Sequence, residues 1–194
     1  MDVALLSLPA LDLASYRPNT FRGQSLPHES EIRDWLDERL GITRKSGGRG
    51  YEGWEAAGSI GFFFEDAMGK ALAEYAGQRL GLIPSVELEK DGILLSPDRL
   101  HPDTMEPWDF KFTWKSVKKN PPEAIWRWQV QFRSYALALG VRSAVVVALY
   151  CCGDYAPPQP RLVVQRMTYT EQELEENWIM IVNGKLAMEK EKGL

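Results

Sequence analysis

The apolar run from Ala144 to Tyr150 constrains the fold of this chain more than any other segment. It reads Ala-Val-Val-Val-Ala-Leu-Tyr and is rich in β-branched side chains. A short continuous run of this kind is typical of a central strand that is buried on both faces. Such a strand belongs to a sheet that is covered by helices, and the rest of the chain supplies both kinds of element.

Helical patterns lie before and after this run. Four helices are expected: residues 31–40 with Ser30 as cap and Gly41 as stop, residues 59–80 ended by Gly81, residues 121–139 opened by Pro121-Pro122 and stopped by Gly140, and a last helix that begins with the capping box Thr170-x-x-Glu173. Their order along the chain, with strands between them, predicts an α/β fold with a central mixed β-sheet flanked by helices.

Strand patterns fill the intervals between these helices. Residues 86–89 and 93–95 form an expected hairpin around the turn Asp91-Gly92, residues 108–114 alternate between apolar and polar, and residues 161–169 form a further strand. We expect one domain over residues 1–194, composed of an extended arm (1–28), a core (29–169) and a C-terminal helix (170–194). His28 and His101 are expected in loops.

Composition excludes several classes of protein. With 194 residues, 44% hydrophobic and 26% charged, the chain has the composition of an ordinary globular domain. No apolar stretch is long enough to span a bilayer, and the apolar N-terminus lacks the basic lead-in of a signal peptide. The two cysteines, Cys151 and Cys152, are neighbours, which favours free thiols in a reducing compartment such as the cytoplasm.

The charge distribution leaves room for nucleic-acid binding. The net charge of −4 counts against it, because binding to a phosphate backbone needs local cations. However, basic residues cluster in two places, at Arg39, Arg44, Lys45 and Arg49 and again at Lys111, Lys115, Lys118 and Lys119. One face of the protein is therefore expected to be basic. A solvated surface of ordinary lysines remains the alternative.

Asp98, Asp109 and Lys111 form the most informative polar set. Asp109 and Lys111 are two positions apart on an expected strand, so both side chains project from one face, while Phe110 points into the core and offers its carbonyl oxygen at the same level. Asp98 follows the hairpin and comes beside Asp109 if the two strands pair. The alternative for an isolated Asp-x-Lys is an ordinary surface ion pair. Glu65, early in an apolar helix, is a further carboxylate, although a glutamate in the first turn can also simply favour the helix dipole.

Carboxylates beside a lysine suit phosphodiester hydrolysis. A hard cation neutralises developing charge and lowers the pKa of the attacking water. Mg²⁺ prefers oxygen ligands and keeps several waters, so two or three carboxylates suffice to hold it. Mn²⁺ is the alternative metal.

Two sequence motifs resemble those of a known nuclease group. Ser96-Pro97-Asp98 followed by Asp109-Phe110-Lys111 is similar to the motif pair of the PD-(D/E)xK nuclease superfamily. Within it, the chain most resembles the phage lambda exonuclease-like (YqaJ-type) viral recombination nucleases, with Gly61-x-x-x-Glu65 matching their first motif. The resemblance implies a restriction-endonuclease-like core. It also implies that Glu65, Asp98, Asp109 and the Phe110 carbonyl bind the metal and that Lys111 is the catalytic lysine. Asp109 stands where that group more often has Glu, and Arg99 stands where it often has Gly.

The same resemblance extends to two helices. On the helix after the lysine strand, Gln131 and Tyr135 fit the pattern Gln-x-x-x-Tyr and lie one turn apart. Gln129 lies on another side of that helix, and we favour Gln131 as the glutamine that faces the metal. Near the N-terminus, Trp35-x-x-x-Arg39 followed by Gly41 and Thr43 is similar to the motif that grips a 5′-phosphate. Arg39, Thr43 and Lys45, together with Tyr135, are therefore the expected DNA-binding and 5′-phosphate-binding residues.

The sequence thus predicts a Mg²⁺-dependent deoxyribonuclease. The leading hypothesis is a phage-type 5′→3′ exonuclease of recombination or repair that acts on linear duplex DNA or its ends. The alternatives are a structure- or sequence-specific endonuclease of the same fold and a catalytically silent DNA-binding or assembly module. By analogy with the group, a single-strand annealing protein and further copies of the chain are expected partners, and no membrane is expected.

Overall fold

A computed structural model describes residues 26–42, 63–64, 66–67, 71, 81–85, 87–151 and 160–193. Its named elements are α1 (Glu29–Arg39), β1 (Ile83–Pro84), β2 (Leu88–Lys90), β3 (Ile93–Leu95), β4 (Arg99–Leu100), β5 (Pro107–Thr113), the 3₁₀ turn η1 (Pro122–Ala124), α4 (Trp126–Leu139), β6 (Ser143–Tyr150), β7 (Arg161–Thr168) and α5 (Glu171–Lys192). The arm over residues 1–25 and most of the helix expected over 59–80 lie outside the described residues; of that helix, Phe63, Phe64, Asp66, Ala67 and Ala71 are described, and all five are helical.

The main sheet is mixed and has the strand order β1-β4-β5-β6-β7. β5 and β6 run parallel and are joined through α4, whereas β4 pairs with β5 and β7 pairs with β6 in antiparallel fashion. The apolar run is β6, which lies between β5 and β7. The central position expected for this run is therefore confirmed.

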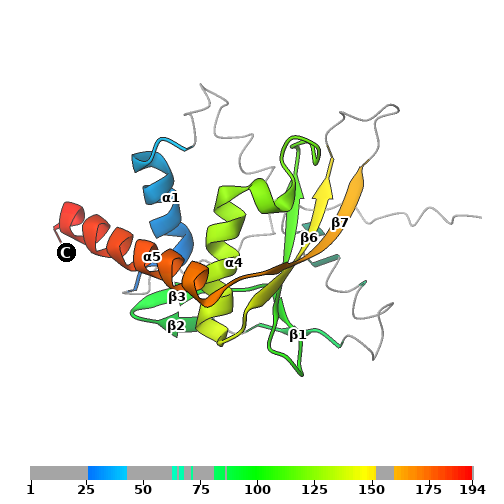
Figure 1. Cartoon of the computed structure of the whole chain (residues 1–194), viewed down its shortest axis with the longest axis horizontal. Coiled ribbons are helices and arrows are strands. Elements are labelled where there is room, and N and C mark those ends of the chain that lie inside the picture. The colour runs from blue at the N-terminus through cyan, green and yellow to red at the C-terminus, as the bar shows by residue number, and fades with distance from the viewer. Residues whose placement is uncertain are drawn as a thin grey trace, which may run out of the picture.

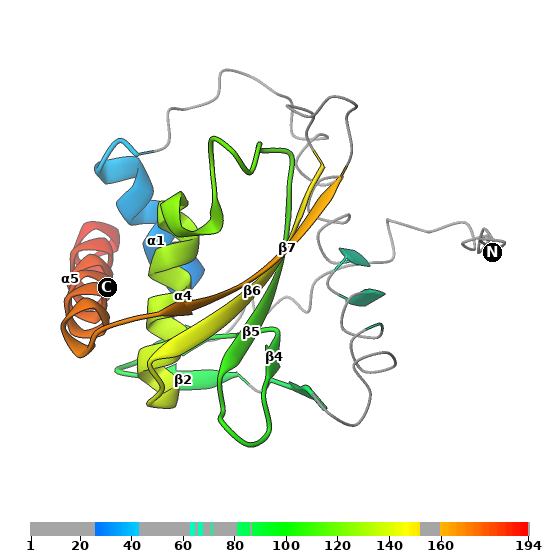
Figure 2. The same ribbon diagram turned by 45° about the vertical axis from the view of Figure 1, so that its right-hand side comes forward.

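The residues of β6 alternate between two apolar layers. Val146 and Ala148 face the layer formed with α1, α4 and α5, whereas Val145 and Val147 pack with Phe64 and other side chains on the opposite face. Figures 1 and 2 show the three helices gathered on one side of the sheet formed by β5, β6 and β7. Both faces of the central strand are buried, as its apolar run requires.

The hairpin and the helix ends follow their sequence signals with two corrections. β2 and β3 pair antiparallel around Asp91 and Gly92, which both have positive φ, as a tight hairpin turn demands. The capping box at Thr170 is present. The cap of α1, however, is His28 and not Ser30, because the His28 ring accepts the N–H of Ser30. The helix expected from Pro121 is divided into η1 and α4, and α4 begins only at Trp126.

The C-terminal helix belongs to the same apolar layer as the core. Trp178 and Ile181 of α5 are buried in the cluster that also contains Ile32 and Leu36 of α1. At Gly184, an added Cβ would lie 3.0 Å from the Leu36 side chain, so α5 approaches α1 as closely as a glycine allows. None of the helices in the described ranges is long and apolar enough to cross a membrane.

Candidate active site

Asp109 and Lys111 lie together on β5, on the face that is covered by α4. The Lys111 ammonium forms an ion pair with Asp109 Oδ2, and the Asp109 side chain is only 1% exposed. Lys111 Nζ also lies 5.9 Å from the centre of the Phe132 ring of α4. Phe110 points to the opposite face, into the cluster around Val145 and Val147. The sequence prediction of a shared face for Asp109 and Lys111 is therefore confirmed.

Asp98 reaches the same place through β4. The pairing of β4 with β5 sets Arg99 opposite Trp108, which brings the preceding Asp98 beside Asp109. The backbone N–H of Phe110 donates a hydrogen bond of 2.7 Å to Asp98 Oδ2. Asp98 lies beside Asp109, as the sequence predicted. The prediction named the wrong strand, however, as the one that brings it there. The second strand of the hairpin, β3, pairs with β2 in a separate sheet, and the short β4 makes the contact.

The buried carboxylate of Asp109 has a polar partner on only one of its two oxygens among the described residues. Within the described part of the chain, Lys111 Nζ contacts Asp109 Oδ2 as an ion pair, and Asp109 Oδ1 has no hydrogen-bond partner. A buried charge with open lone pairs is costly, and a bound cation would compensate it. Asp98, Asp109 and the Phe110 carbonyl form an all-oxygen set that suits Mg²⁺.

The third predicted carboxylate, Glu65, lies outside the described residues. The described ranges contain no group of three His, Cys, Asp or Glu side chains that could hold a metal ion. The described residues nevertheless fit the predicted metal, because Asp109 Oδ1 has no hydrogen-bond partner among them and a second carboxylate, Asp98, lies beside it.

Gln131 and Gln129 lie on different sides of α4. Gln131 Nε2 donates to Tyr135 Oη at 2.7 Å, on the side of the Ser96-Pro97-Asp98 loop. Gln129 Nε2 donates to the Pro122 carbonyl at 3.1 Å and contacts Met167 of β7. The geometry supports the choice of Gln131 as the glutamine nearer the site.

Tyr135 is an internal support of this loop. Its hydroxyl donates to the Ser96 carbonyl at 2.9 Å, and the side chain is 1% exposed. Burial raises the pKa of Tyr135 well above its ordinary value, and the nearby carboxylates of Asp109 and Glu29 raise it further. A neutral and enclosed phenol holds the loop that carries Asp98. Its burial favours this positioning role over the contact with DNA that was predicted for it.

His28 belongs to the same network, which the sequence did not indicate. Its Nδ1 accepts the backbone N–H of Ser30 at 3.2 Å, so the ring proton resides on Nε2. Nε2 then donates to Ser96 Oγ at 3.1 Å. Burial lowers the pKa of His28 below its ordinary value, which keeps the ring in this neutral form. His28 thereby ties the start of α1 to the Ser96-Pro97-Asp98 loop.

Glu29 is a second residue that sequence reasoning missed. It is fully buried at the start of α1, where Oε2 accepts from Arg33 Nη1 at 3.3 Å and Oε1 has no hydrogen-bond partner in the described ranges. Burial raises the pKa of Glu29, while the neighbouring cations Arg33 and Lys111 lower it. A first-turn glutamate is so common that only tertiary packing distinguishes this one.

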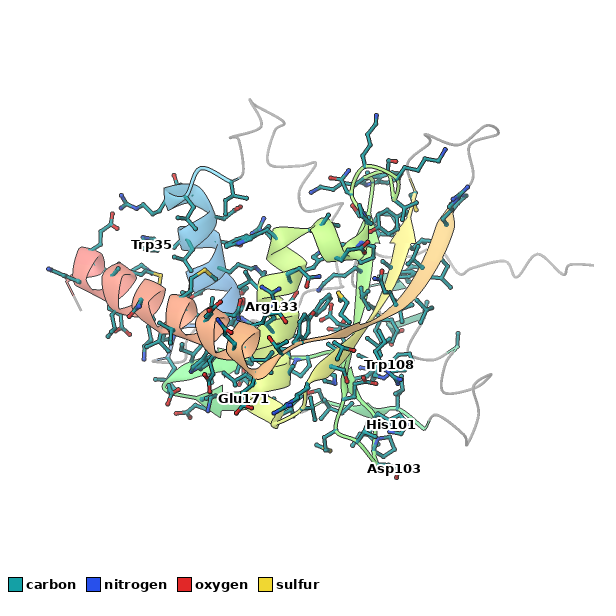
Figure 3. All side chains as sticks on the ribbon, viewed as in Figure 1. Trp35, His101, Asp103, Trp108, Arg133 and Glu171 are labelled. Atoms are coloured by element: carbon teal, nitrogen blue, oxygen red, sulfur yellow. The ribbon has the colours of Figure 1, made fainter. Side chains whose placement is uncertain are left out.

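The expected 5′-phosphate grip is only partly described. Arg39 pairs with Glu191 of α5 and lies over the Trp35 ring, whose Nε1 donates to the same carboxylate at 3.1 Å. Figure 3 shows Trp35 on α1 beside the far end of α5. Thr43 and Lys45 lie outside the described residues. The structure therefore brings Asp98, Asp109, Lys111, Gln131 and Tyr135 together, and it engages Arg39 elsewhere.

Two shallow cavities lie along β7. One, of about 440 Å³, is lined by residues such as Glu106, Arg142 and Arg166. The other, of about 350 Å³, lies between β7, α4 and the start of α5. Neither is lined by Asp98, Asp109 or Lys111. The candidate site is therefore identified from its charged side chains, Asp98, Asp109 and Lys111, and not from either of these cavities.

Comparison with solved structures identifies the fold. An alkaline exonuclease (LHK-Exo) from Laribacter hongkongensis is similar with a TM-score of 0.53 and 17% sequence identity, covering 84% of this chain and 80% of the exonuclease. The structure of LHK-Exo in complex with dAMP gives a TM-score of 0.54 at 15% identity, covering 86% of this chain and 89% of the other. A protein named SSO0001 matches with a TM-score of 0.53 at 11% identity, covering 84% and 78% of the two chains.

Sequence comparisons give no match. No protein-family model matches this chain. No curated protein matches it by sequence. At sequence identities this low, structural similarity is evidence for the fold alone. The predicted nuclease fold, a mixed sheet flanked by helices, is confirmed. The similarity to the alkaline exonuclease therefore holds at the level of the fold.

Proposed function

We propose that this protein is a Mg²⁺-dependent deoxyribonuclease and that it acts as a phage-type 5′→3′ exonuclease in the cytoplasm. The observation that carries the proposal is the buried Asp109. Its Oδ1 has no hydrogen-bond partner among the described residues, Lys111 pairs with its Oδ2, and Asp98 lies beside it. The fold shared with an alkaline exonuclease adds support, and so does the dAMP bound in one neighbour. DNA is the substrate in this proposal.

Each residue has a physical role in the proposed reaction. Asp98, Asp109, the Phe110 carbonyl and Glu65 would hold Mg²⁺ (or Mn²⁺), which stabilises charge on the phosphate and acidifies a bound water. The Lys111 ammonium, fixed by Asp109 and by the Phe132 ring, orients the attacking water toward the phosphorus. Gln131, Tyr135 and His28 keep the Asp98 loop at its distance from β5.

The first experiment tests metal use, mode of attack and polarity together. End-labelled linear duplex DNA and covalently closed circular DNA are incubated with the protein, with and without Mg²⁺. We expect digestion of the linear DNA alone, only with Mg²⁺, and with release of the 5′ label first. Asp109→Ala should abolish digestion. Asp103→Ala is the matched control, because Asp103 is an exposed carboxylate at the tip of the β4–β5 connection, away from the helices in Figure 3.

An endonuclease of the same fold is the second candidate. Arg39 is engaged by Glu191, so the arginine expected to select a 5′-phosphate is not directed at Asp109 in this structure. Cleavage of the closed circular DNA would favour the endonuclease over the exonuclease. A third possibility, a silent binding module, requires that wild-type protein binds DNA but cuts neither substrate and shows no heat of Mg²⁺ binding by calorimetry.

A further inference from the structure

We infer that the loop after β5, residues Trp114 to Asn120, is a binding platform for unpaired DNA, on which Trp114 stacks with a base and Lys115 and Lys118 contact the phosphates. The inference rests on the proposed function and adds to it a surface that receives the strand next to the cleavage site. It is carried by the position, exposure, anchoring and charge of the loop.

The loop begins directly beyond the candidate catalytic lysine. Trp114 follows the last residue of β5, three positions after Lys111, which corresponds to about 10 Å of extended strand. β5 and β6 are parallel, so their carboxyl ends meet at this edge of the sheet. Ligands of open α/β sheets bind outside the carboxyl ends of parallel strands. Trp114 packs on Phe112, on the sheet face opposite Lys111, so a DNA strand whose phosphate lies at Lys111 would reach the ring by passing around the carboxyl end of β5.

Trp114 presents an open aromatic surface. Its side chain is 59% exposed, although tryptophan is usually among the most buried residues on average. One edge rests against Phe112, with ring centroids 5.3 Å apart and planes nearly perpendicular, and Phe112 in turn contacts Phe64. The ring is thus supported from behind, and little side-chain entropy remains to be lost when a flat ligand stacks on it.

The loop is anchored rather than free. The Asn120 carbonyl accepts a hydrogen bond of 2.9 Å from the hydroxyl of Tyr150, the last residue of β6. The Asn120 N–H donates to the Ser116 carbonyl at 2.8 Å, and the Cys151 N–H donates to the Thr113 carbonyl at 2.9 Å. These contacts fix both ends of the loop to the sheet. Trp114 and the lysines are therefore displayed on a rigid frame.

The charge of this segment is opposite to that of the whole chain. From Lys111 to Arg127 the sequence carries five cations and one carboxylate, whereas the whole chain has a net charge of −4. Lys115 and Lys118 are exposed, and that carboxylate, Glu123, accepts a hydrogen bond from Gln165 of β7. Figure 3 shows nitrogen-tipped side chains standing out from the loop between β5 and α4. An exposed aromatic ring next to the exposed Lys115 and Lys118 matches the chemistry of single-stranded nucleic acid, whose unstacked bases can stack on aromatic side chains.

The experiment measures DNA binding in the absence of cleavage. All variants are made on an Asp109→Asn background, and fluorescence anisotropy follows binding to a labelled single-stranded oligonucleotide and to the blunt duplex of the same sequence. We expect Trp114→Ala to weaken single-strand binding by about tenfold or more and Trp114→Phe to retain most of it. The blunt duplex, whose bases are paired, should lose much less. Ile179→Ala, at an apolar residue of α5 that is 60% exposed, is the matched control and should change neither affinity.

The lysines are tested by salt dependence. Replacing Lys115 and Lys118 together with glutamine should reduce the slope of log Kd against log salt by about 1.4 for the single strand. Lys190→Gln with Lys192→Gln, two exposed cations at the end of α5, should leave the slope unchanged.

The outcomes separate this inference from the proposed function. If Trp114→Ala binds the single strand as tightly as its parent while the active protein digests DNA, the platform is wrong and the nuclease stands. An equal loss on single strand and duplex would also overturn the stacking role. If the platform variants lose binding but the protein cuts no DNA, the platform stands and the nuclease falls. If the parent binds no single-stranded DNA, the platform is overturned, and the digestion experiment decides on the nuclease by itself.

Discussion

His28 Nε2 and Ser96 Oγ lie 3.1 Å apart, and this contact joins the first turn of α1 to the loop that carries Asp98. The other nitrogen of the same ring accepts the Ser30 N–H and caps the helix. One imidazole therefore has two separable duties, helix capping and loop positioning.

Substitutions at His28 should separate the two duties. His28→Ala removes both, and the lost cap alone should lower the free energy of unfolding by about 1–2 kcal/mol. His28→Asn keeps a short side-chain oxygen for the Ser30 N–H but does not reach Ser96, so it should recover most of the stability. Both variants should bind Mg²⁺ more weakly, because the Asp98 loop loses its tie to α1. Thermal unfolding and calorimetric Mg²⁺ titration measure the two effects.

His101→Ala is the control for this pair. His101 also makes a local side-chain hydrogen bond, accepting the Asp103 N–H at 3.3 Å, but it lies in the β4–β5 connection. It should leave Mg²⁺ affinity unchanged. A His28→Asn protein with wild-type Mg²⁺ affinity would contradict the positioning role.

The face shared by Asp109 and Lys111 could be predicted because it depends on one local regularity. Alternation along a strand sets residues two apart on the same side, whatever the strand pairs with. The hairpin turn at Asp91-Gly92 and the capping box at Thr170 also depend on residues close in sequence, so they could be predicted for the same reason. The central β6 could be recognised from its apolar run, because burial on both faces excludes polar residues.

The roles of His28 and Glu29 could not be read in this way. His28 contacts a residue 68 positions away, so no local pattern indicates it. Glu29 resembles any first-turn glutamate until the packing of α1 buries it completely. The same limit explains the error about Asp98: a two-residue strand such as β4 is too short to show periodicity, so the pairing was assigned to the longer hairpin strand.

Metal binding should appear as a gain in stability that depends on Asp109. A ligand that binds only the folded state stabilises it, by about 2.7 kcal/mol at a hundred times its Kd. For a domain of this size we expect Mg²⁺ to raise Tm by roughly 5–10 °C. Asp109→Asn should lose this shift.

Differential scanning fluorimetry over a series of Mg²⁺ concentrations measures the shift. Asp103→Asn changes an exposed carboxylate and should keep the full response. An Asp109→Asn protein that still responds to Mg²⁺ like wild type would place the metal elsewhere.

Glu29 should make stability depend on pH in a defined direction. Because burial raises its pKa above 4.5, the folded protein holds more protons than the unfolded chain above that pH. The free energy of unfolding contributed by this group therefore falls as pH rises from about 4.5 through the folded-state pKa. Glu29→Gln keeps an acceptor for Arg33 but removes the charge. It should raise Tm at neutral pH and reduce the decline of stability with rising pH.

Urea unfolding at several pH values measures this contribution, and Glu31→Gln, on the same first turn of α1, is the matched control. A Glu29→Gln protein with the wild-type dependence on pH would mean that Glu29 does not carry a raised pKa. A loss of stability at neutral pH would mean that the charge pair with Arg33 outweighs the cost of burial.

A large side chain at Gly184 should lower the free energy of unfolding, because α5 packs against α1 at this point. A Cβ there would lie 3.0 Å from Leu36 and 3.1 Å from Ile32, both within the apolar layer that supports α1. Gly184→Leu must push the two helices apart, and overpacking of this kind costs about 1–3 kcal/mol despite the better helix propensity of leucine. Asn183→Leu, at the neighbouring exposed position of α5, is the matched control and should be neutral or slightly stabilising.

Since α1 carries His28 and Glu29, the displaced helix should also weaken Mg²⁺ binding in Gly184→Leu but not in Asn183→Leu. Equal stability of the two variants in urea unfolding would show that the α1–α5 contact is looser than the distances at Gly184 imply.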